Sequence, residues 1–252
     1  MRHKAGPRPN LLALLLVALT FLCLPALLAF ADAGTLPASR RSDAAYESAR
    51  PKLERDLQAE GLALGSPVFL RITKAPAELT VFVQKSDGVF QPFRTWPVCS
   101  VSGTLGPKKH EGDGQAPEGF YEIRPAQMNP SSTYHLSFNL GYPNAFDRAN
   151  GYTGSFLMVH GACVSIGCFA MTDPVIDDIW TLMQAAYEEG QTSVDVHIFP
   201  FPMTDANLKA HAGDPNAAFW DGLAPAWTAF EETGQVPDVT VSGKSYQVRA
   251  AQ

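Results

Sequence analysis

Short segments of alternating hydrophobic and polar residues dominate the middle of the chain, and this pattern is typical of β-strands. Residues 78–85 place Leu79, Val81 and Val83 at alternate positions, and the hairpin-turn sequence Ser86-Asp87-Gly88 follows them. We expect further strands at residues 68–73, 89–98, 119–123, 134–140, 156–160 and 193–199. The sequence therefore predicts a sheet-rich core.

Two other segments carry hydrophobic residues at helical spacing. In residues 39–61, Leu53 and Leu57 lie one turn apart in an alanine-rich, charged sequence, which predicts a helix packed weakly on the domain or standing between it and a membrane. The second segment opens with Thr172-Asp173-Pro174 and runs to Gly190, and its hydrophobic positions are Ile176, Ile179, Leu182 and Met183. We expect this helix to pack against the sheet.

The C-terminal residues predict secondary structure but contain no motif for catalysis or binding. Residues 219–223 and 227–232 are predicted to be helical, with Trp220, Trp227 and Phe230 as packing residues. A short strand at 239–241 and a polar tail follow. The predicted fold is mainly β with flanking helices.

The N-terminus has the plan of a signal peptide. Basic residues precede a hydrophobic stretch from Leu11 to Leu24, and small residues favour cleavage after Ala31 or Ala33. An uncleaved membrane anchor is the alternative. We therefore divide the chain into a signal peptide (1–33), a helical segment or linker (34–66), a catalytic domain (67–210) and a helical C-terminal extension with a tail (211–252).

Charge and composition exclude several functions. Without residues 1–33 the chain keeps 16 basic and 24 acidic residues, a net charge of about −8, which disfavours nucleic acid as a partner. Phosphate-binding loops and familiar metal-ligand spacings are missing from the sequence, so we predict neither a cofactor nor a metal. The loop from Gly103 to Pro117 reads as a solvated connection, with a position beside a groove as the alternative.

A histidine and a glycine-flanked cysteine occur within residues 160–171, His-Gly-Ala-Cys-Val-Ser-Ile-Gly-Cys-Phe-Ala-Met. His160 follows the hydrophobic residues 155–159 and is predicted to sit at the exposed end of a buried strand. Gly167 frees the backbone before Cys168, so that amides there can face a developing oxyanion. A thiol nucleophile needs a base, and His160 supplies one.

This segment resembles the YkuD-type L,D-transpeptidase family, whose signature is a strand-end His-Gly followed by Ser-x-Gly-Cys. The resemblance is closest to the YafK-like murein branch and extends over residues 67–210, through 119–121, 134–145 and 197–201. It implies a mixed β-sheet or sandwich core with a helix after the catalytic turn. It also implies Cys168 as nucleophile, His160 as general base and acid, Gly167 as an oxyanion-hole backbone group and Ser165 as the residue that orients the loop.

The chain departs from the wider family in two ways. Ala170 stands where many members have arginine, and the interval between His160 and Cys168 is short. We expect residues 139–154 to compensate, with Arg148 binding a substrate carboxylate. The predicted substrate-binding residues are Arg148, Tyr142, His135 and Asn139.

Three cysteines remain after residue 33, so at least one thiol stays free within a single chain. A Cys99–Cys163 disulfide leaves Cys168 free and is the pairing that the enzyme interpretation prefers. Pairing of Cys163 with Cys168 blocks the nucleophile, and Cys99 and Cys163 can equally be reduced.

The resemblance implies an enzyme of the cell envelope, periplasmic or secreted, that acts on peptidoglycan stem peptides through a thioester. Resolution by an amine gives a crosslink, and resolution by water gives a hydrolase that trims peptides or releases a wall-linked lipoprotein. A non-catalytic wall-binding protein is the third alternative. Contact with a membrane is expected only through an uncleaved signal segment.

Overall fold

The first of two five-stranded sheets, here sheet A, has the strand order β3-β2-β1-β10-β5. Its strands are β1 (Val68–Lys74), β2 (Ala77–Gln84), β3 (Phe90–Pro97), β5 (Gly119–Ile123) and β10 (Val194–Phe199). The β1–β10 pair is parallel, and the other pairs are antiparallel. All five strands fall within a residue or two of their predicted ranges, because each one alternates between a buried and a more exposed face or is buried throughout.

The second sheet, sheet B, carries the cysteine turn and has the order β4-β9-β8-β7-β6. Its strands are short: β4 (Ser100–Val101), β6 (Met128–Asn129), β7 (Ser137–Asn139), β8 (Met158–His160) and β9 (Phe169–Ala170). The strands predicted over 134–140 and 156–160 are therefore too long. His135 and Phe156 have φ angles of 67° and 54°, which end the extended backbone.

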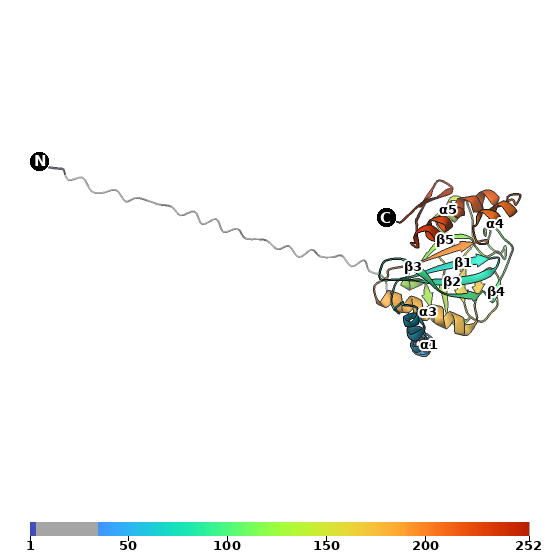
Figure 1. Cartoon of the computed structure of the whole chain (residues 1–252), viewed down its shortest axis with the longest axis horizontal. Helices are drawn as coiled ribbons and strands as arrows, with labels where there is room; N and C mark the ends of the chain where they lie inside the picture. Colours follow the sequence, from blue (N-terminus) through green and yellow to red (C-terminus); the bar gives the residue numbers. More distant parts are fainter. Residues whose placement is uncertain (4–34, 252) are drawn as a thin grey trace. The chain divides into compact units, whose positions relative to one another are not determined.

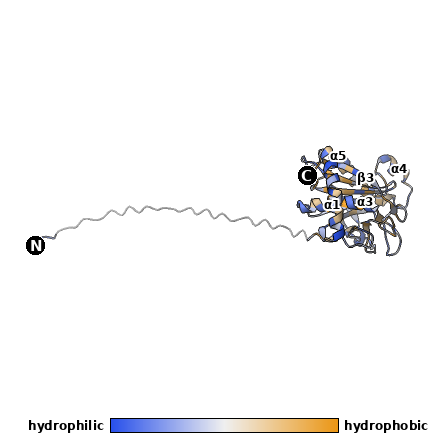
Figure 2. Ribbon diagram, turned by 90° about the horizontal axis from the view of Figure 1, so that it is seen from below, coloured by the Kyte–Doolittle hydropathy of each residue, from blue (hydrophilic) through white to orange (hydrophobic). Residues whose placement is uncertain are grey.

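One side of sheet A packs on two helices, α1 (Arg40–Ala59) and α3 (Asp173–Glu188) (Figure 1). Ser39 caps α1 through its side chain, and Leu53 and Leu57 are fully buried in the main core. Weak packing of this helix was the wrong expectation, because α1 lies directly against α3. Hydropathy colouring places hydrophilic residues on the outer faces of these helices (Figure 2).

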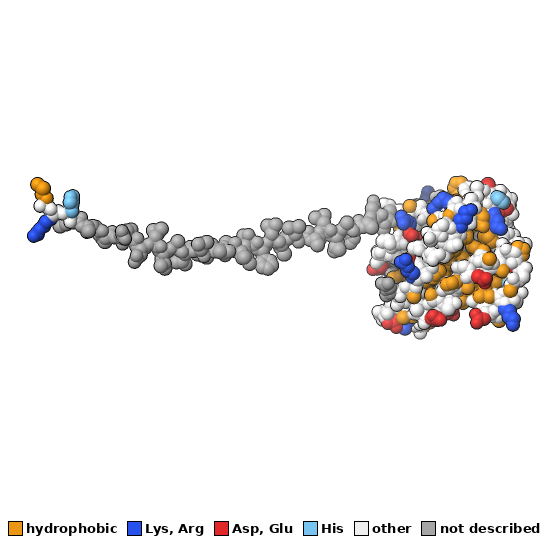
Figure 3. All heavy atoms as spheres, turned by 90° about the horizontal axis from the view of Figure 1, so that it is seen from above, with side chains coloured by type: hydrophobic (Ala, Val, Ile, Leu, Met, Phe, Trp, Pro, Cys, Tyr) orange, Lys and Arg blue, Asp and Glu red, His pale blue; other side chains and the backbone are white. Residues whose placement is uncertain are grey.

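The other side of sheet A is covered by α5 (Ala217–Thr233), which follows the short helix α4 (Asp205–Ala210). One continuous helix with Pro225 inside replaces the two predicted segments. Phe230 of α5 packs against Phe69 and Phe82 of the sheet. On this side, hydrophobic side chains reach the surface between charged ones (Figure 3).

The chain after α5 forms a hairpin, β11 (Asp238–Ser242) and β12 (Ser245–Arg249). The expected polar tail is thus the second strand of a two-stranded sheet. Tyr246 of this hairpin stacks on Phe146, with ring centroids 4.3 Å apart. Phe146 belongs to α2 (Ala145–Ala149), and the 3-10 helix η1 (Pro125–Gln127) precedes β6.

The computed structural model describes residues 1–3 and 35–251. Both predicted cleavage positions lie outside these residues, and so does the predicted signal peptide apart from residues 1–3. Within the described ranges, no helix is long and apolar enough to cross a membrane. Asp32–Gln252 forms one compact unit, and the domain boundaries given above remain predictions.

Candidate active site

The ends of two parallel strands bring His160 and Cys168 together. His160 ends β8 and pairs with Ala170, and Val159 pairs with Phe169. One more step in this register aligns Cys168 with Met158. Side chains alternate along strands, so Cys168 and His160 lie on one face, offset by two residues or about 7 Å along the strand direction. Two side chains that lean toward each other can span this offset.

The imidazole of His160 is held in a defined tautomer. Its Nδ1 lies 2.6 Å from the carbonyl oxygen of Gly161. Because a carbonyl can only accept, Nδ1 carries the proton and Nε2 keeps its lone pair. The Tyr134 ring lies 4.8 Å from the imidazole, and burial lowers the pKa of His160. The imidazole is therefore neutral at neutral pH, and because His160 is buried, the expectation of an exposed strand end was wrong.

Cys168 is the free cysteine of the described residues, and it is partly exposed. Its Sγ lies 3.7 Å from the carbonyl oxygen of Phe156. Burial raises the pKa of the Cys168 thiol, while the backbone amide of Met158 and the charge of Lys108 act to lower it. The Cys168 side chain is thus a protonated thiol at neutral pH.

A disulfide between Cys99 and Cys163 ties the turn between His160 and Cys168 to the end of β3. This is the pairing among the open alternatives that leaves Cys168 free. The amide of Ala162 donates to Asp173 Oδ1 at 2.7 Å, at the start of α3. Ala162 and Cys163 both have positive φ angles, 65° and 50°. The disulfide and the helix start hold this unusual backbone in place.

Hydroxyl groups organise the backbone directly before the nucleophile. Ser165 Oγ donates to the carbonyl oxygen of Cys168 at 2.6 Å. The amide of Gly167 donates to Ser102 Oγ. Gly167 has a φ angle of 100°, which a residue with a side chain rarely adopts. The Gly167 amide is thus aimed outward from the turn, with a hydroxyl as its present acceptor.

The loop from Gly103 to Pro117 packs behind the cysteine turn, so its interpretation as a merely solvated connection was wrong. Lys108 is 4 % exposed, and its Nζ contacts Asp113 Oδ1 at 2.5 Å. A Cβ added to Gly167 would lie 3.6 Å from the carbonyl oxygen of Gln115. The loop therefore places the Lys108 ammonium near the Cys168 sulfur, and it packs its own backbone against the cysteine turn.

A buried ion pair anchors the same loop to the rest of the protein. Lys74 Nζ lies 3.0 Å from Glu118 Oε1, and both side chains are almost completely buried. Glu118 also accepts from the amide of Gly106 at 2.7 Å and from Trp220 Nε1 at 2.8 Å. Sheet A, α5 and the loop therefore meet at one carboxylate whose hydrogen bonds are satisfied.

Comparison with known proteins agrees with this geometry. The family model described as "L,D-transpeptidase catalytic domain" (YkuD) matches residues 70–198, about half of the chain. The chain is 44% identical over 185 residues to the protein named "Putative L,D-transpeptidase YafK" from Escherichia coli K12, and the match covers 73% of this chain and 75% of that protein.

The chain belongs to the L,D-transpeptidase family. The same identity and coverage are found with the YafK protein of Escherichia coli O157:H7. Among solved structures, the helical cell shape determining protein Pgp2 (K307A mutant) from Campylobacter jejuni matches with 18% identity, a TM-score of 0.45 and 82% coverage of each chain. The predicted family and fold class are confirmed.

Of the substrate-binding residues predicted for this L,D-transpeptidase, two lie near the site. His135 Nε2 is 2.7 Å from Asp177 Oδ1, and its Cβ lies beside Gly161. Tyr142 is buried and donates to the carbonyl oxygen of Lys108 at 3.0 Å. Tyr142 thus supports the loop behind the turn rather than presenting its hydroxyl to solvent.

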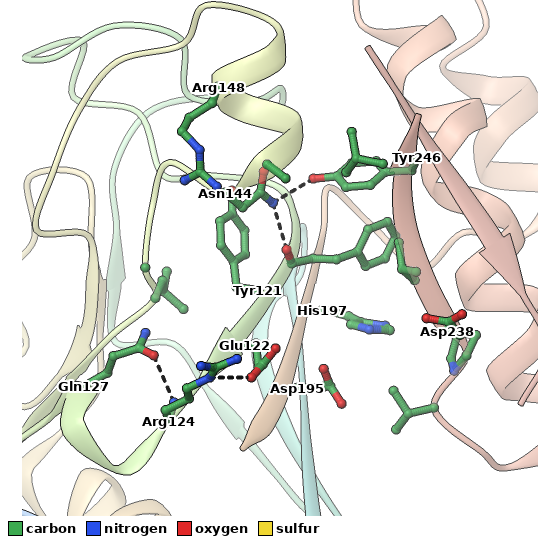
Figure 4. Close-up of a pocket in the computed structure, with 18 of the residues that line it drawn as sticks. Tyr121, Glu122, Arg124, Gln127, Asn144, Arg148, Asp195, His197, Asp238 and Tyr246 are labelled. Atoms are coloured by element: carbon green, nitrogen blue, oxygen red, sulfur yellow. Dashed lines mark hydrogen bonds and ion pairs between the residues drawn. The ribbon is translucent and has the colours of Figure 1, made fainter. Parts of the chain in front are cut away.

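The other two residues, Arg148 and Asn139, line a separate cavity of about 850 Å³ at the β5 edge of sheet A. Its lining includes neither Cys168 nor His160. Arg148 of α2 also donates to the carbonyl oxygen of Pro143, and Figure 4 shows its side chain on the cavity lining. The structure therefore separates Arg148 and Asn139 from the cysteine turn.

Large exposed hydrophobic residues of the region 35–251 lie in or next to the segments that carry His160 and Cys168. They are Tyr134, Phe156, Val164 and Ile166, of which Ile166 is the most exposed at 89 %. Phe156 and Ile166 flank Cys168, and Tyr134 packs on His160. These side chains form an apolar border to the site.

Sequence reasoning missed Ser102, Lys108 and Asp173, which contact the turn from distant parts of the chain. Their residue types are common in solvated loops and helix starts, so the sequence carries no local signal for them. In the described residues, no group of three or more His, Cys, Asp and Glu side chains is placed to hold a metal ion.

Proposed function

We propose that this protein is a cysteine acyltransferase that attacks the bond between an L-centre and a D-centre in peptidoglycan stem peptides. The observation that carries the proposal is that the register of β8 and β9 places a free, partly exposed thiol, directly before β9, on the same face as a neutral imidazole at the end of β8. Membership of the L,D-transpeptidase family supports the same bond type and substrate class.

In the proposed mechanism, the free Nε2 of His160 takes the Cys168 proton as Sγ attacks the substrate carbonyl. The tetrahedral intermediate then collapses, and the imidazolium returns the proton to the leaving amine. A thioester to Cys168 remains. The hydrogen bond from Nδ1 to the carbonyl of Gly161 stabilises the imidazolium during this step.

We assign the oxyanion to backbone amides at Gly167 and Cys168. The Gly167 amide already donates to an oxygen atom, that of Ser102, so the substrate oxyanion would take the place of this hydroxyl. Ser165 orients this turn through its bond to the Cys168 carbonyl. The apolar border formed by Phe156 and its neighbours limits access of water to the thioester.

The thioester can be resolved by an amine or by water. Amine attack by a neighbouring diaminopimelate forms a crosslink, and water releases a shortened stem or a wall-linked lipoprotein. Both routes use Cys168 and His160, and the acceptor alone separates them. We place this reaction in the cell envelope, where the wall is found and where the Cys99–Cys163 disulfide is stable.

The test is mass spectrometry of sacculi incubated with the full chain and with Cys168→Ala. The alanine variant should form no product, and His160→Gln should be slower by about 10² to 10⁴. His110→Gln, which changes an exposed histidine, is the matched control and should retain activity. New dimers indicate transpeptidation, and shortened stems or free lipoprotein indicate hydrolysis. The same products from Cys168→Ala would overturn the mechanism.

A further inference from the structure

A cavity lies away from Cys168, between the polar face of β5 and β10 and the C-terminal hairpin. Its volume is about 850 Å³, within the range of ligand sites in proteins. β11 and β12 contribute one wall through Val239, Val241 and Tyr246. Tyr246 is fixed there by a hydrogen bond from Asn144 Nδ2 at 2.9 Å.

Two strands place charged groups on the cavity floor in a fixed arrangement. Asp195 of β10 pairs in register with Glu122 of β5, and His197 pairs with Phe120. Cross-strand partners point to the same face, so two carboxylates stand side by side. Glu122 is neutralised by Arg124 at 2.9 Å. Asp195 has neither a hydrogen bond nor an ion pair to the described part of the chain.

His197 is the second unpartnered group. It is 3 % exposed and lies between the rings of Phe69 and Phe120, at 4.8 Å and 4.7 Å. It lines the cavity, and neither ring nitrogen has a hydrogen-bond partner among residues 35–251. Burial lowers the pKa of His197 to about 3, so the ring is neutral and keeps one donor and one acceptor. The ring nitrogens are not among the fully enclosed polar atoms, so they remain open to the cavity, where a ligand or water can satisfy them.

Positively and negatively charged side chains both line this cavity. Arg124 and Arg148 provide guanidinium groups, and Asp195 and Asp238 provide carboxylates (Figure 4). In the close-up, Asp195, His197 and Asp238 face the same space between β10 and β11. A lining of this kind is complementary to a ligand that carries an amine and a carboxylate close together.

We propose that this cavity is a second peptide site, which binds a stem peptide through the amine and carboxylate on the free end of its diaminopimelate residue. Asp195 and Asp238 receive the amine, and Arg124 and Arg148 receive the carboxylate. The choice of stem peptide rests on the proposed function, whereas the charge complementarity does not. The site holds a strand of the wall while Cys168 acts on another.

The test is isothermal titration calorimetry of the full chain with the tripeptide L-alanyl-γ-D-glutamyl-meso-diaminopimelate. This probe has no bond beyond diaminopimelate for Cys168 to attack. Asp195→Asn and Arg124→Ala should each weaken binding about tenfold or more. Asp221→Asn and Arg55→Ala change exposed residues outside the cavity and are the matched controls, which should bind as the unmodified chain does.

Chemically modified probes test which cavity residue binds the diaminopimelate amine and which binds the carboxylate. Acetylation of the diaminopimelate amine should weaken binding to the unmodified chain and have no further effect on Asp195→Asn. Amidation of the neighbouring carboxylate should behave in the same way with Arg124→Ala. Thermal unfolding of each variant shows whether it is folded, and a folded variant of either residue that binds with unchanged affinity overturns the proposal.

Failure of this inference is distinct from failure of the proposed function. If the unmodified chain forms no Cys168 adduct with a tetrapeptide stem, but the cavity variants weaken tripeptide binding, the mechanism fails and the second site stands. If the adduct forms and all variants bind the tripeptide equally well, the second site fails and the mechanism stands.

Discussion

Polar groups behind the Cys168 turn have protein partners, whereas two groups that line the cavity beneath the hairpin, Asp195 and His197, have none in the described region. Glu118 accepts from Lys74, Gly106 and Trp220, and Lys108 contacts Asp113. Asp195, which is partly exposed, and His197, which is buried, have no such partners in the described region. A satisfied group fixes a structure, and an unsatisfied one is available to a ligand.

The two regions differ in what holds their groups in position. The cysteine turn has little regular structure, and its positive φ angles are held by a disulfide, by Asp173 and by the loop behind it. The cavity floor is regular sheet, so its groups are positioned by strand register alone. Substitutions should therefore destabilise the first region and leave the fold of the second intact.

The largest effect is expected from Glu118→Ala. Loss of the carboxylate leaves the Lys74 ammonium buried without its partner, which should lower the free energy of unfolding by about 3 to 5 kcal/mol. Denaturant titration measures it. Glu54→Ala, which breaks an exposed pair on α1, is the control and should change stability little. Equal losses in the two variants would refute a special role for Glu118.

Removal of the disulfide should come next. Cys99→Ser with Cys163→Ser opens a link between residues 64 positions apart, and should lower the unfolding free energy by about 2 to 4 kcal/mol. The turn also loses its tether, so acyl transfer should slow. Denaturant titration and the sacculus assay are the measurements, and reductant applied to the unmodified chain is the control. Unchanged stability and activity would contradict the tethering role.

A substitution in the cavity should stabilise the protein, in contrast to the two destabilising changes above. Burial, with a smaller contribution from Glu122, raises the pKa of Asp195 to about 6, above its value in the unfolded chain. The folded state therefore loses stability as pH rises through 6, and the charge costs most above that pH. Asp195→Asn should stabilise the protein by about 1 kcal/mol at pH 8 and by nothing at pH 4.

Thermal unfolding across this pH range measures the Asp195 effect, and Asp221→Asn should show no such dependence. Glu122, Arg124, Arg148, Asp238 and His197 line the same cavity as Asp195. A variant that is less stable than the unmodified chain at every pH would show that Asp195 has a structural partner.

The smallest effect is expected at Lys108. Its charge lowers the pKa of the Cys168 thiol against the effect of burial, so Lys108→Met should shift alkylation of Cys168 to higher pH. The rate of iodoacetamide labelling as a function of pH measures this shift. Lys109→Met, at the exposed neighbouring position, is the control. A shift to lower pH would exclude Lys108 as the stabilising cation.

Much of the fold could be predicted because hydrophobic periodicity reports on burial within one segment. It located the strands of sheet A and the helix after the cysteine. It failed at His135 and Phe156, where the polarity pattern suits a strand but the backbone turns to positive φ. It also failed for the polar tail, whose alternation of Tyr246 and Val248 with polar residues is a strand of the hairpin.

The candidate site divides in the same way. His160, Ser165, Gly167 and Cys168 lie within nine residues, so one local motif and its family resemblance were enough to select them. The expectation for Arg148 came from its position in a nearby loop of the sequence, but α2 carries it into the cavity wall. Sequence proximity does not define which face of the protein a loop residue reaches.

By itself, the sequence determined most of the strand and helix pattern, the family, and a histidine and a cysteine as candidates for acyl transfer, because these properties reside in contiguous residues. Only the tertiary structure decided that Cys99 pairs with Cys163, that the charge of Lys108 acts on the Cys168 thiol, and that β5, β10 and the C-terminal hairpin enclose a charged cavity. Each of these depends on segments far apart in the chain, and their distances are set by packing of the two sheets and their helices.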